Sequence, residues 1–334
     1  MAFDLAFIWA GLIAFAVLAY VVLDGFDLGV GILFPFARTT RERDIMMNSV
    51  APVWDGNETW LVLGGGGLMA VFPLAYATVM SALYAPLIAM LLALTLRGVA
   101  FEFRWRTQRG KFIWDLAFSG GSAIAAFAQG IALGALVQGI PVVNRAYAGG
   151  WWDWLSPFSI VTGVALVAGY ALLGATWLVM KTTGKLQMRA RKQAWISGIV
   201  TLSLIAIVSA YTPLLNPAYV DRWFAWPTAI YSFIVPALVA VCGSLLFTGL
   251  TRNHDRQPFL SALGLFVLSY IGIGISFYPF IVPPSLTIWQ AAAPESSLRF
   301  LLVGALVLIP IILAYTAYAY WVFRGKIDPE EGYH

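Results

Sequence analysis

Three pairs of charged residues lie inside or at the edge of apolar segments, where a charge is costly. They are Asp24 and Asp27 in LDGFDLGVGIL, Asp55 and Glu58 in WDGNETW, and Arg97 and Glu102 in LRGVAFEFR. Each acid pair has i,i+3 spacing, so its two side chains share one face of a helix. Carboxylates in a low-dielectric site, with an arginine that keeps one of them ionised, can pass protons through water and hydroxyls. These residue types predict a proton path.

Each pair also has a structural interpretation. Asp55 could cap the N-terminus of a helix, since Pro52 lies just upstream and Glu58 has the capping-box spacing. The pair in LRGVAFEFR could instead extend to the membrane interface on long aliphatic stems. The two acids in LDGFDLGVGIL lie deep in one apolar segment and have no capping role there. A functional or inter-helix role is favoured for that pair.

The composition places these charges in a membrane protein. The chain has 334 residues, of which 60% are hydrophobic and 11% charged, whereas soluble domains are about half apolar and about a quarter charged. Apolar stretches of about twenty residues indicate helices rather than the alternating strands of a barrel. The first stretch lacks a basic n-region and a small-residue cleavage site, so it is interpreted as a span and not a removable signal. The expected fold class is an all-α integral membrane protein.

Nine apolar segments are expected to cross the membrane. Their approximate limits are 5–34, 55–76, 78–101, 112–138, 157–180, 194–213, 225–249, 258–280 and 298–323. No loop between them is long enough to fold as a soluble domain, so residues 1–334 are expected to form one polytopic domain. Short connections make neighbouring spans antiparallel, which favours up-down bundles.

The loops predict the topology. Of the 20 Lys and Arg residues, 17 lie in the alternate loops at 35–54, 97–111, 181–193, 250–257 and 324–334. The positive-inside rule then places the N-terminus outside, the C-terminus in the cytoplasm and the six charged residues toward the cytoplasmic side. The net charge of +4 is explained by these loops and does not indicate nucleic-acid binding.

Several chemistries lack the residues that they need. The two histidines, His254 and His334, lie outside the spans, so a haem or metal held by this chain alone is not expected. There is no Walker A sequence, because GGGG at 64–67 lacks the following Lys-Ser/Thr. Cys242 is the one cysteine and can form no intrachain disulfide. Gln129 and Gln138 are expected to make inter-helix hydrogen bonds.

At this point the sequence resembles a known family, subunit II of the cytochrome bd-type quinol oxidases. The resemblance rests on LDGFDLGVGIL, NSVAPVWDGNETWL and GGLMAVFPLAYA near the N-terminus. Further along it rests on PFSIVTGVALVAGYALLGATWLVMKTTGKLQ, SFYPFIVPPSLTIWQAAAPESSL and LIPIILAYTAYAYWVFRGK, and it covers essentially the whole chain.

This resemblance implies two four-helix bundles, within roughly 5–138 and 157–280, plus a peripheral helix at roughly 298–323. It implies a haem-free subunit of the bacterial cytoplasmic (inner) membrane that completes an oxygen-reducing complex. The haem-bearing subunit I would hold haems b and d, with single-helix accessory subunits, lipids, and ubiquinone or menaquinone as a structural ligand as further possible partners.

The resemblance also assigns roles to residues. Asp24, Asp27 and Asp55 match residues that are linked to proton transfer, whereas Glu58 stands where some members have Gln. Glu58 is still included in the expected path, because its i,i+3 spacing places it on the same helix face as Asp55. The residues expected to support the path are Trp54, Asn57, Arg97 and Glu102.

Two other functions fit the residues alone. The carboxylates could serve a proton-coupled transporter, which would show spans broken at mid-membrane. They could also act only as helix caps and inter-helix contacts in a structural scaffold.

Overall fold

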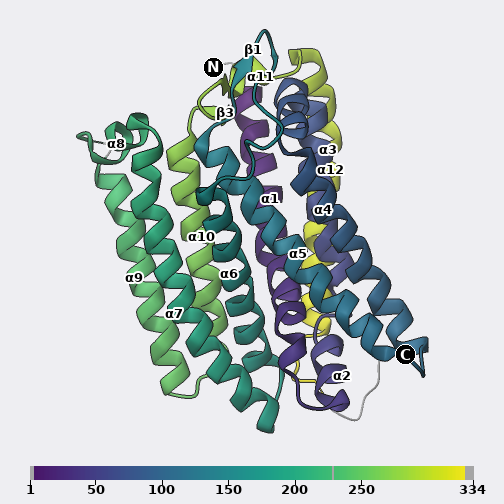
Figure 1. Cartoon of the computed structure of the whole chain (residues 1–334). Coiled ribbons are helices and arrows are strands. Elements are labelled where there is room, and N and C mark those ends of the chain that lie inside the picture. The colour runs from purple at the N-terminus through teal and green to yellow at the C-terminus, as the bar shows by residue number, and fades with distance from the viewer. Residues whose placement is uncertain (1–3, 228, 328–334) are drawn as a thin grey trace.

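The structure, a computed structural model, describes residues 4–227 and 229–327. Long helices dominate it (Figure 1). The helices are α1 (Leu5–Leu33), α2 (Thr40–Asn48), α3 (Trp54–Val71), α4 (Pro73–Arg106), α5 (Lys111–Gln138), α6 (Pro157–Lys181), α7 (Gly184–Leu215), α8 (Pro217–Phe224), α9 (Ala229–Thr251), α10 (Gln257–Phe277), α11 (Ile288–Ala291) and α12 (Glu295–Val322). A 3₁₀ turn, Phe34–Phe36, follows α1.

Two small antiparallel hairpins complete the described part of the chain. One pairs β1 (Val142–Val143) with β2 (Ala146–Tyr147), and the other pairs β3 (Phe280–Val282) with β4 (Leu286–Thr287). They lie at the end of the molecule where α1 begins, and α2 lies at the opposite end (Figure 1). We call these the hairpin end and the α2 end.

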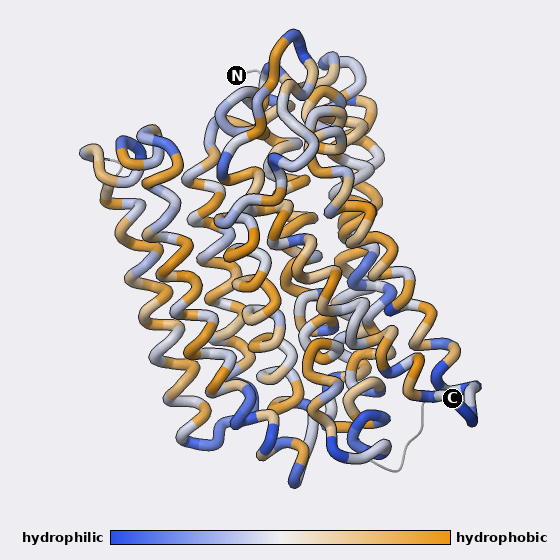
Figure 2. Tube along the Cα trace, in the orientation of Figure 1, coloured by the Kyte–Doolittle hydropathy of each residue, from blue (hydrophilic) through white to orange (hydrophobic). Residues whose placement is uncertain are grey.

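Eight of the described helices are long and apolar enough to cross a membrane, which confirms the all-α membrane fold. They are α1, α4, α5, α6, α7, α9, α10 and α12. The expected second span, α3, has 18 residues and carries four polar side chains in its first two turns, Asp55, Asn57, Glu58 and Thr59. At about 1.5 Å per residue it is close to the hydrocarbon thickness of about 30 Å. Figure 2 shows apolar residues along the long helices and hydrophilic ones gathered near their ends.

Some predicted limits were wrong. The second and third segments were divided near residue 77, but the chain bends at Phe72, whose φ of −126° and ψ of 61° are not helical. Pro73 then begins α4, because a proline at the first helical position has no N–H to leave unpaired. The segment expected at 194–213 is longer, since α7 begins at Gly184 and its first turns are basic and polar.

The long helices form two neighbouring groups. The first group contains α1, α3, α4 and α5, in which α1 and α4 each pack against α3 and α5. The second group contains α6, α7, α9 and α10, in which α6 and α9 each pack against α7 and α10. The groups meet where α1 and α5 contact α6. α12 lies on the outside, against α1 and α3.

Glycines bring the two groups into backbone contact. A Cβ on Gly29 of α1 would lie 1.8 Å from the carbonyl oxygen of Tyr170, and one on Gly174 of α6 would lie 2.2 Å from the carbonyl carbon of Gly29. On α5, a Cβ on Gly130 would lie 2.6 Å from the Cα of Gly163. Small residues permit such close approach in membrane helices.

Candidate functional site: a buried ion-pair cluster

Arg97 of α4 is the centre of the polar cluster. Its side chain is fully buried, and its Nη1 lies 2.7 Å from Oδ1 of Asp24, which is also fully buried. Its Nη2 donates to the carboxylate of Glu58. One guanidinium therefore joins α1, α3 and α4. The interpretation that Arg97 extends to the membrane interface is wrong.

Close packing of α5 explains why this arginine is buried. A Cβ on Gly121 would lie 2.6 Å from the carbonyl oxygen of Ala93 and 3.2 Å from the backbone nitrogen of Arg97. Glycine at this position lets α5 cover the α4 backbone directly. A buried charge must then be paired, because water cannot reach it.

Asp27 lies in a second part of the cluster, one helical turn from Asp24. The Asn57 side-chain amide donates to Oδ2 of Asp27 at 2.7 Å and to the carbonyl of Leu23 at 3.2 Å. Its own oxygen accepts a hydrogen bond of 3.0 Å from the Tyr320 hydroxyl. Asn57 thus connects Asp27 on α1 with α12.

A third branch extends from the cluster toward α6. Gln129 of α5 donates to the Tyr20 hydroxyl, and the Tyr170 hydroxyl donates to Gln129, each at 2.8 Å. Tyr20 lies one turn before Asp24 on α1. The inter-helix role expected for Gln129 is confirmed, and Gln138 likewise accepts a hydrogen bond from Ser156 at 2.5 Å.

Three carboxylate oxygens of the cluster are buried without a hydrogen-bond partner among the described residues. They are both oxygens of Asp24, of which Oδ1 is ion-paired with Arg97, and Oδ1 of Asp27. Buried polar atoms are normally satisfied. Such atoms are suited to hold a proton or an ordered water molecule, as a proton-transfer group must.

Glu58 opens the cluster to the outside of the chain, because a quarter of its side chain is exposed. Asp55 lies one turn earlier on α3 and is exposed. The capping interpretation of Asp55 is wrong, since Val53 is the N-cap of α3 and no side chain caps it. Asp55 instead stands in the first turn, where a negative charge is favoured by the helix dipole.

Two expected supporting residues lie outside the buried cluster. Glu102 is exposed and lies 3.8 Å from Arg106, one turn further along α4. Trp54 stacks on Phe101, with ring centroids 4.6 Å apart. Trp54 therefore packs between α3 and α4, and Glu102 does not reach the buried acids.

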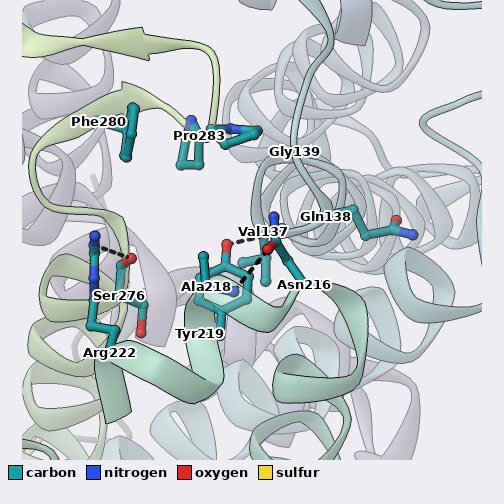
Figure 3. Close-up of a pocket in the computed structure, with 11 residues that line it drawn as sticks. Val137, Gln138, Gly139, Asn216, Ala218, Tyr219, Arg222, Ser276, Phe280 and Pro283 are labelled. Carbon is teal, nitrogen blue, oxygen red and sulfur yellow. Dashed lines mark hydrogen bonds between the residues drawn. The ribbon is translucent and has the colours of Figure 1, made fainter. Parts of the chain in front are cut away.

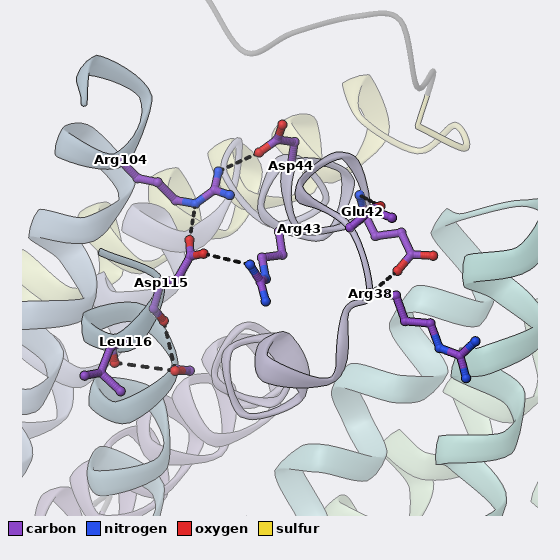
Figure 4. A network of polar contacts seen from close by, with 9 residues as sticks. Arg38, Glu42, Arg43, Asp44, Arg104, Asp115 and Leu116 are labelled. Carbon is purple, nitrogen blue, oxygen red and sulfur yellow. Dashed lines mark hydrogen bonds and ion pairs between the residues drawn. The ribbon is translucent and has the colours of Figure 1, made fainter. Parts of the chain in front are cut away.

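A separate ionic network ties α2 to α4 and α5 at the α2 end (Figure 4). Arg104 is fully buried, with Nη1 at 2.7 Å from Asp44 and Nε at 2.6 Å from Asp115. Arg43 lies 3.3 Å from the same Asp115. On the other side of α2, Arg189 of α7 lies 2.5 Å from Glu42.

The pKa of the Glu42 carboxyl is lowered by its surroundings. Partial burial raises its pKa, and hydrogen bonds from Arg189 and from the backbone N–H of Arg38 lower it, with a net shift below the usual 4.5. Glu42 is therefore ionised near neutral pH, and the contact between α2 and α7 is an ion pair.

A small cavity lies near the hairpin end (Figure 3). Its volume of about 30 Å³ accommodates ordered water and not a quinone ring. Arg222 donates to the carbonyls of Ser276 and Tyr278 beside it, and the Tyr219 hydroxyl donates to the carbonyl of Val137. These contacts pair α8 with its neighbours.

Sequence reasoning missed three tyrosines of the cluster. Tyr20 and Tyr170 lie in segments expected to span the membrane, and a hydroxyl one turn from Asp24 is a signal that could have identified Tyr20. Tyr320 lies 263 positions from Asn57, and no local pattern predicts such a contact. Among the described residues, no group of three or more His, Cys, Asp or Glu side chains is arranged to hold a metal ion.

The helices and the buried cluster together define a multi-pass membrane protein with a buried cluster of acidic, basic and polar side chains. Comparison with protein families gives a more specific result. Residues 5–323 match the family model described as cytochrome bd terminal oxidase subunit II. The chain belongs to this family, whose members are subunits of an oxidoreductase complex.

Individual relatives agree with this assignment. Cytochrome bd-I ubiquinol oxidase subunit 2 of Escherichia coli K12 is 34% identical, over 98% of this chain and 96% of that protein. Cytochrome bd ubiquinol oxidase subunit 2 of Bacillus subtilis is 31% identical, over 97% of each chain. A chain of the bd oxidase structure from Geobacillus thermodenitrificans has the same fold, with a TM-score of 0.80 at 18% identity over 96% of this chain and 99% of that one.

Proposed function

We propose that this chain is the haem-free subunit II of a quinol:oxygen oxidoreductase in an aerobic respiratory chain. It completes the assembly with a haem-bearing subunit I and supplies a route for protons to the oxygen-reducing site. The isolated chain is not catalytic. The relatives named as ubiquinol oxidase subunits support the reaction, and the buried cluster supports the proton route.

The observation that carries the route is the graded exposure of three carboxylates. Asp55 is exposed, Glu58 is a quarter exposed and Asp24 is fully buried. Asp55 and Glu58 share a face of α3, and Arg97 bonds both Glu58 and Asp24. Protons would enter at Asp55, pass Glu58 and reach Asp24, with Asp27 as a second buried acceptor.

Orientation is part of the proposal. The α2 end faces the cytoplasm, because the basic loops before α3, before α5 and before α7 lie at that end. The N-terminus would then lie outside and the C-terminus in the cytoplasm of a bacterial inner membrane. Protons consumed in oxygen reduction would come from the cytoplasm, so the complex would build a gradient without a pump.

The other proposed partners follow from the family. Haems b and d would be held by subunit I. Single-helix accessory subunits and lipids would cover further apolar faces of the spans. Ubiquinone or menaquinone would be a structural ligand between helices, and the cavity near Arg222 is too small to be its site.

The first experiment isolates the complex. The tagged chain is purified from its native membrane in mild detergent, and a reduced-minus-oxidised visible spectrum is recorded. A second large subunit with a red-shifted d-type haem band is the expected result. A colourless eluate that contains this chain alone would contradict the oxidase assignment.

The second experiment tests the route with Asp55→Asn, Glu58→Gln and Asp24→Asn. Each should lower quinol-driven oxygen uptake and leave the haem spectrum normal, because the protons and not the haems are affected. Glu295→Gln is the control, since this exposed acid lies at the hairpin end and pairs with Arg299 at 2.6 Å. Wild-type turnover in all three variants would favour the scaffold interpretation.

A further inference from the structure

α12 lies on the outside of the molecule and is bound near both ends, since Trp9 donates to the carbonyl of Leu298 in its first turn and Tyr320 in its last turn packs against the core. Along its length the apolar side chains are exposed, including Phe300 at 80% and Val303 at 67%, and Leu298 is its one buried residue. By contrast, three other elements contact the region from Tyr320 to Gly325. The last turn is therefore positioned by ring contacts of Tyr320 and by hydrogen bonds to its carbonyls and hydroxyl.

Lys181, the last residue of α6, binds the end of α12. Its buried ammonium group donates to the carbonyl of Phe323 and, at 3.1 Å, to the carbonyl of Gly325. The last carbonyls of a helix carry partial negative charge and attract a cation. The same group lies 5.0 Å from the centroid of the Trp177 ring. Lys181 thus caps a helix other than its own.

The segment after α12 strengthens this contact. The N–H of Ile327 donates to the carbonyl of Lys181 at 2.9 Å. Lys326 lies 2.7 Å from Asp255 and donates to the carbonyl of Thr182 at 3.2 Å. The chain beyond α12 therefore runs along the end of α6, and Lys181 lies at the centre of that contact.

Tyr320 lies three residues before Phe323, on the turn that Lys181 holds. Its ring meets Phe26 and Trp177 edge-on, with centroids 6.3 Å and 6.4 Å away. Its hydroxyl donates to Asn57, whose amide donates to Asp27. Trp177 therefore lies between Lys181 and Tyr320, and a shift of the α12 end would move the Tyr320 hydroxyl.

A small cavity of about 10 Å³ lies between α12 and the start of α3, with Gly56 and Tyr320 in its lining. Beside this cavity the Tyr320 hydroxyl of α12 donates to Asn57 of α3. This hydrogen bond is therefore a direct polar contact between the two helices.

We propose that Lys181 is a positioning residue for Asp27, because it holds the last turn of α12 so that Tyr320 fixes the Asn57 amide on the Asp27 carboxyl. This proposal deepens the proton route of the proposed function and rests on it. Lys181 touches neither the acid nor any proton in transit. It acts through a chain of three contacts that cross four helices.

The test is a double-mutant cycle in the assembled complex. Lys181→Met removes the ammonium and retains the aliphatic stem, and Tyr320→Phe removes only the hydroxyl. Lys185→Met is the matched control, since Lys185 is exposed and lies four residues further on. Turnover number and KM for a soluble quinol are measured in complexes of equal haem content.

Each single variant should lower the turnover number by about fivefold, the value of one ordinary hydrogen bond, with KM unchanged. The double variant should be no slower than either single one, because both act on the same contact. Lys181→Arg should restore turnover, since a guanidinium also binds carbonyls. Lys185→Met should match the wild type.

Other results would overturn the proposal. Effects that multiply in the double variant would show that Lys181 does not act through Tyr320, and a Lys181→Met turnover equal to that of Lys185→Met would remove its role. If Lys181→Met fails to assemble, Tyr320→Phe decides, and normal turnover in it overturns the proposal. Normal turnover in Asp24→Asn would instead contradict the proton route itself.

Discussion

The guanidinium of Arg97 lies 2.7 Å from the carboxylate of Asp24, and neither side chain exposes any surface. The two residues come from α4 and α1, and 73 positions separate them in the sequence. A buried ion pair of this kind is expensive to break, because the remaining partner keeps its charge without water or counter-ion.

Arg97→Met should therefore destabilise the protein strongly. The expected cost is about 3–5 kcal/mol, the usual range when one partner of a buried pair is removed. Asp24→Asn combined with Arg97→Met should recover part of that loss, because the carboxylate of Asp24 is removed together with its partner. Thermal unfolding of the purified complex measures both. A double variant that is no more stable than Arg97→Met would contradict the pairing.

Arg104→Met should also be destabilising, and Arg106→Met should not. Arg104 is fully buried and holds Asp44 and Asp115 at 2.7 Å and 2.6 Å, so its loss leaves two carboxylates without their main partner. Arg106 forms an exposed pair with Glu102 at 3.8 Å, a kind that contributes about 0–1 kcal/mol. The difference between their melting temperatures is the measurement. Equal melting temperatures would exclude a stabilising role for the α2 network.

Gly174→Ala should prevent the two groups of helices from meeting. Its Cβ would lie 2.2 Å from the backbone of Gly29, which cannot move aside as a flexible side chain would. Gly304→Ala is the control, because a Cβ there meets nothing within 4 Å. Size-exclusion chromatography and haem content report assembly. Normal assembly of Gly174→Ala would contradict the backbone contact between α1 and α6.

The Glu42–Arg189 ion pair predicts a pH dependence of stability. The pKa of Glu42 is lowered from 4.5 in the folded protein, so this pair stabilises fully above the unfolded pKa and is lost as the pH falls through the folded pKa. Melting temperature should fall from about pH 5 downward. Glu42→Gln should reduce that fall, and an identical acid limb in the variant would contradict the assignment.

The sequence predicted part of the cluster for a physical reason. Asp24 and Asp27 lie deep in an apolar segment, where only burial against a partner makes a charge tolerable. The same argument applied to Arg97 identified a residue that could neutralise them. The fold class followed from the length of the apolar stretches alone.

The rest depends on how helices rotate about their axes. Asp55 and Glu58 have the same spacing as the α1 acids, yet only Glu58 contacts Arg97. Contact of α3 with α1 sets this rotation, since a Cβ on Gly64 would lie 3.3 Å from Cγ2 of Val17. Composition and spacing do not determine that rotation, nor which turn of α12 reaches Asn57.

The glycine contacts between α1, α5 and α6 have a consequence for motion. Carriers that alternate access rock one half of the fold against the other and so need a parting surface at mid-membrane. Here the halves touch through main-chain atoms at Gly29, Gly174, Gly130 and Gly163. A rocking motion of one half against the other would have to break these backbone contacts. These backbone contacts thus favour a rigid chain, and the proposed proton route requires no movement of its helices.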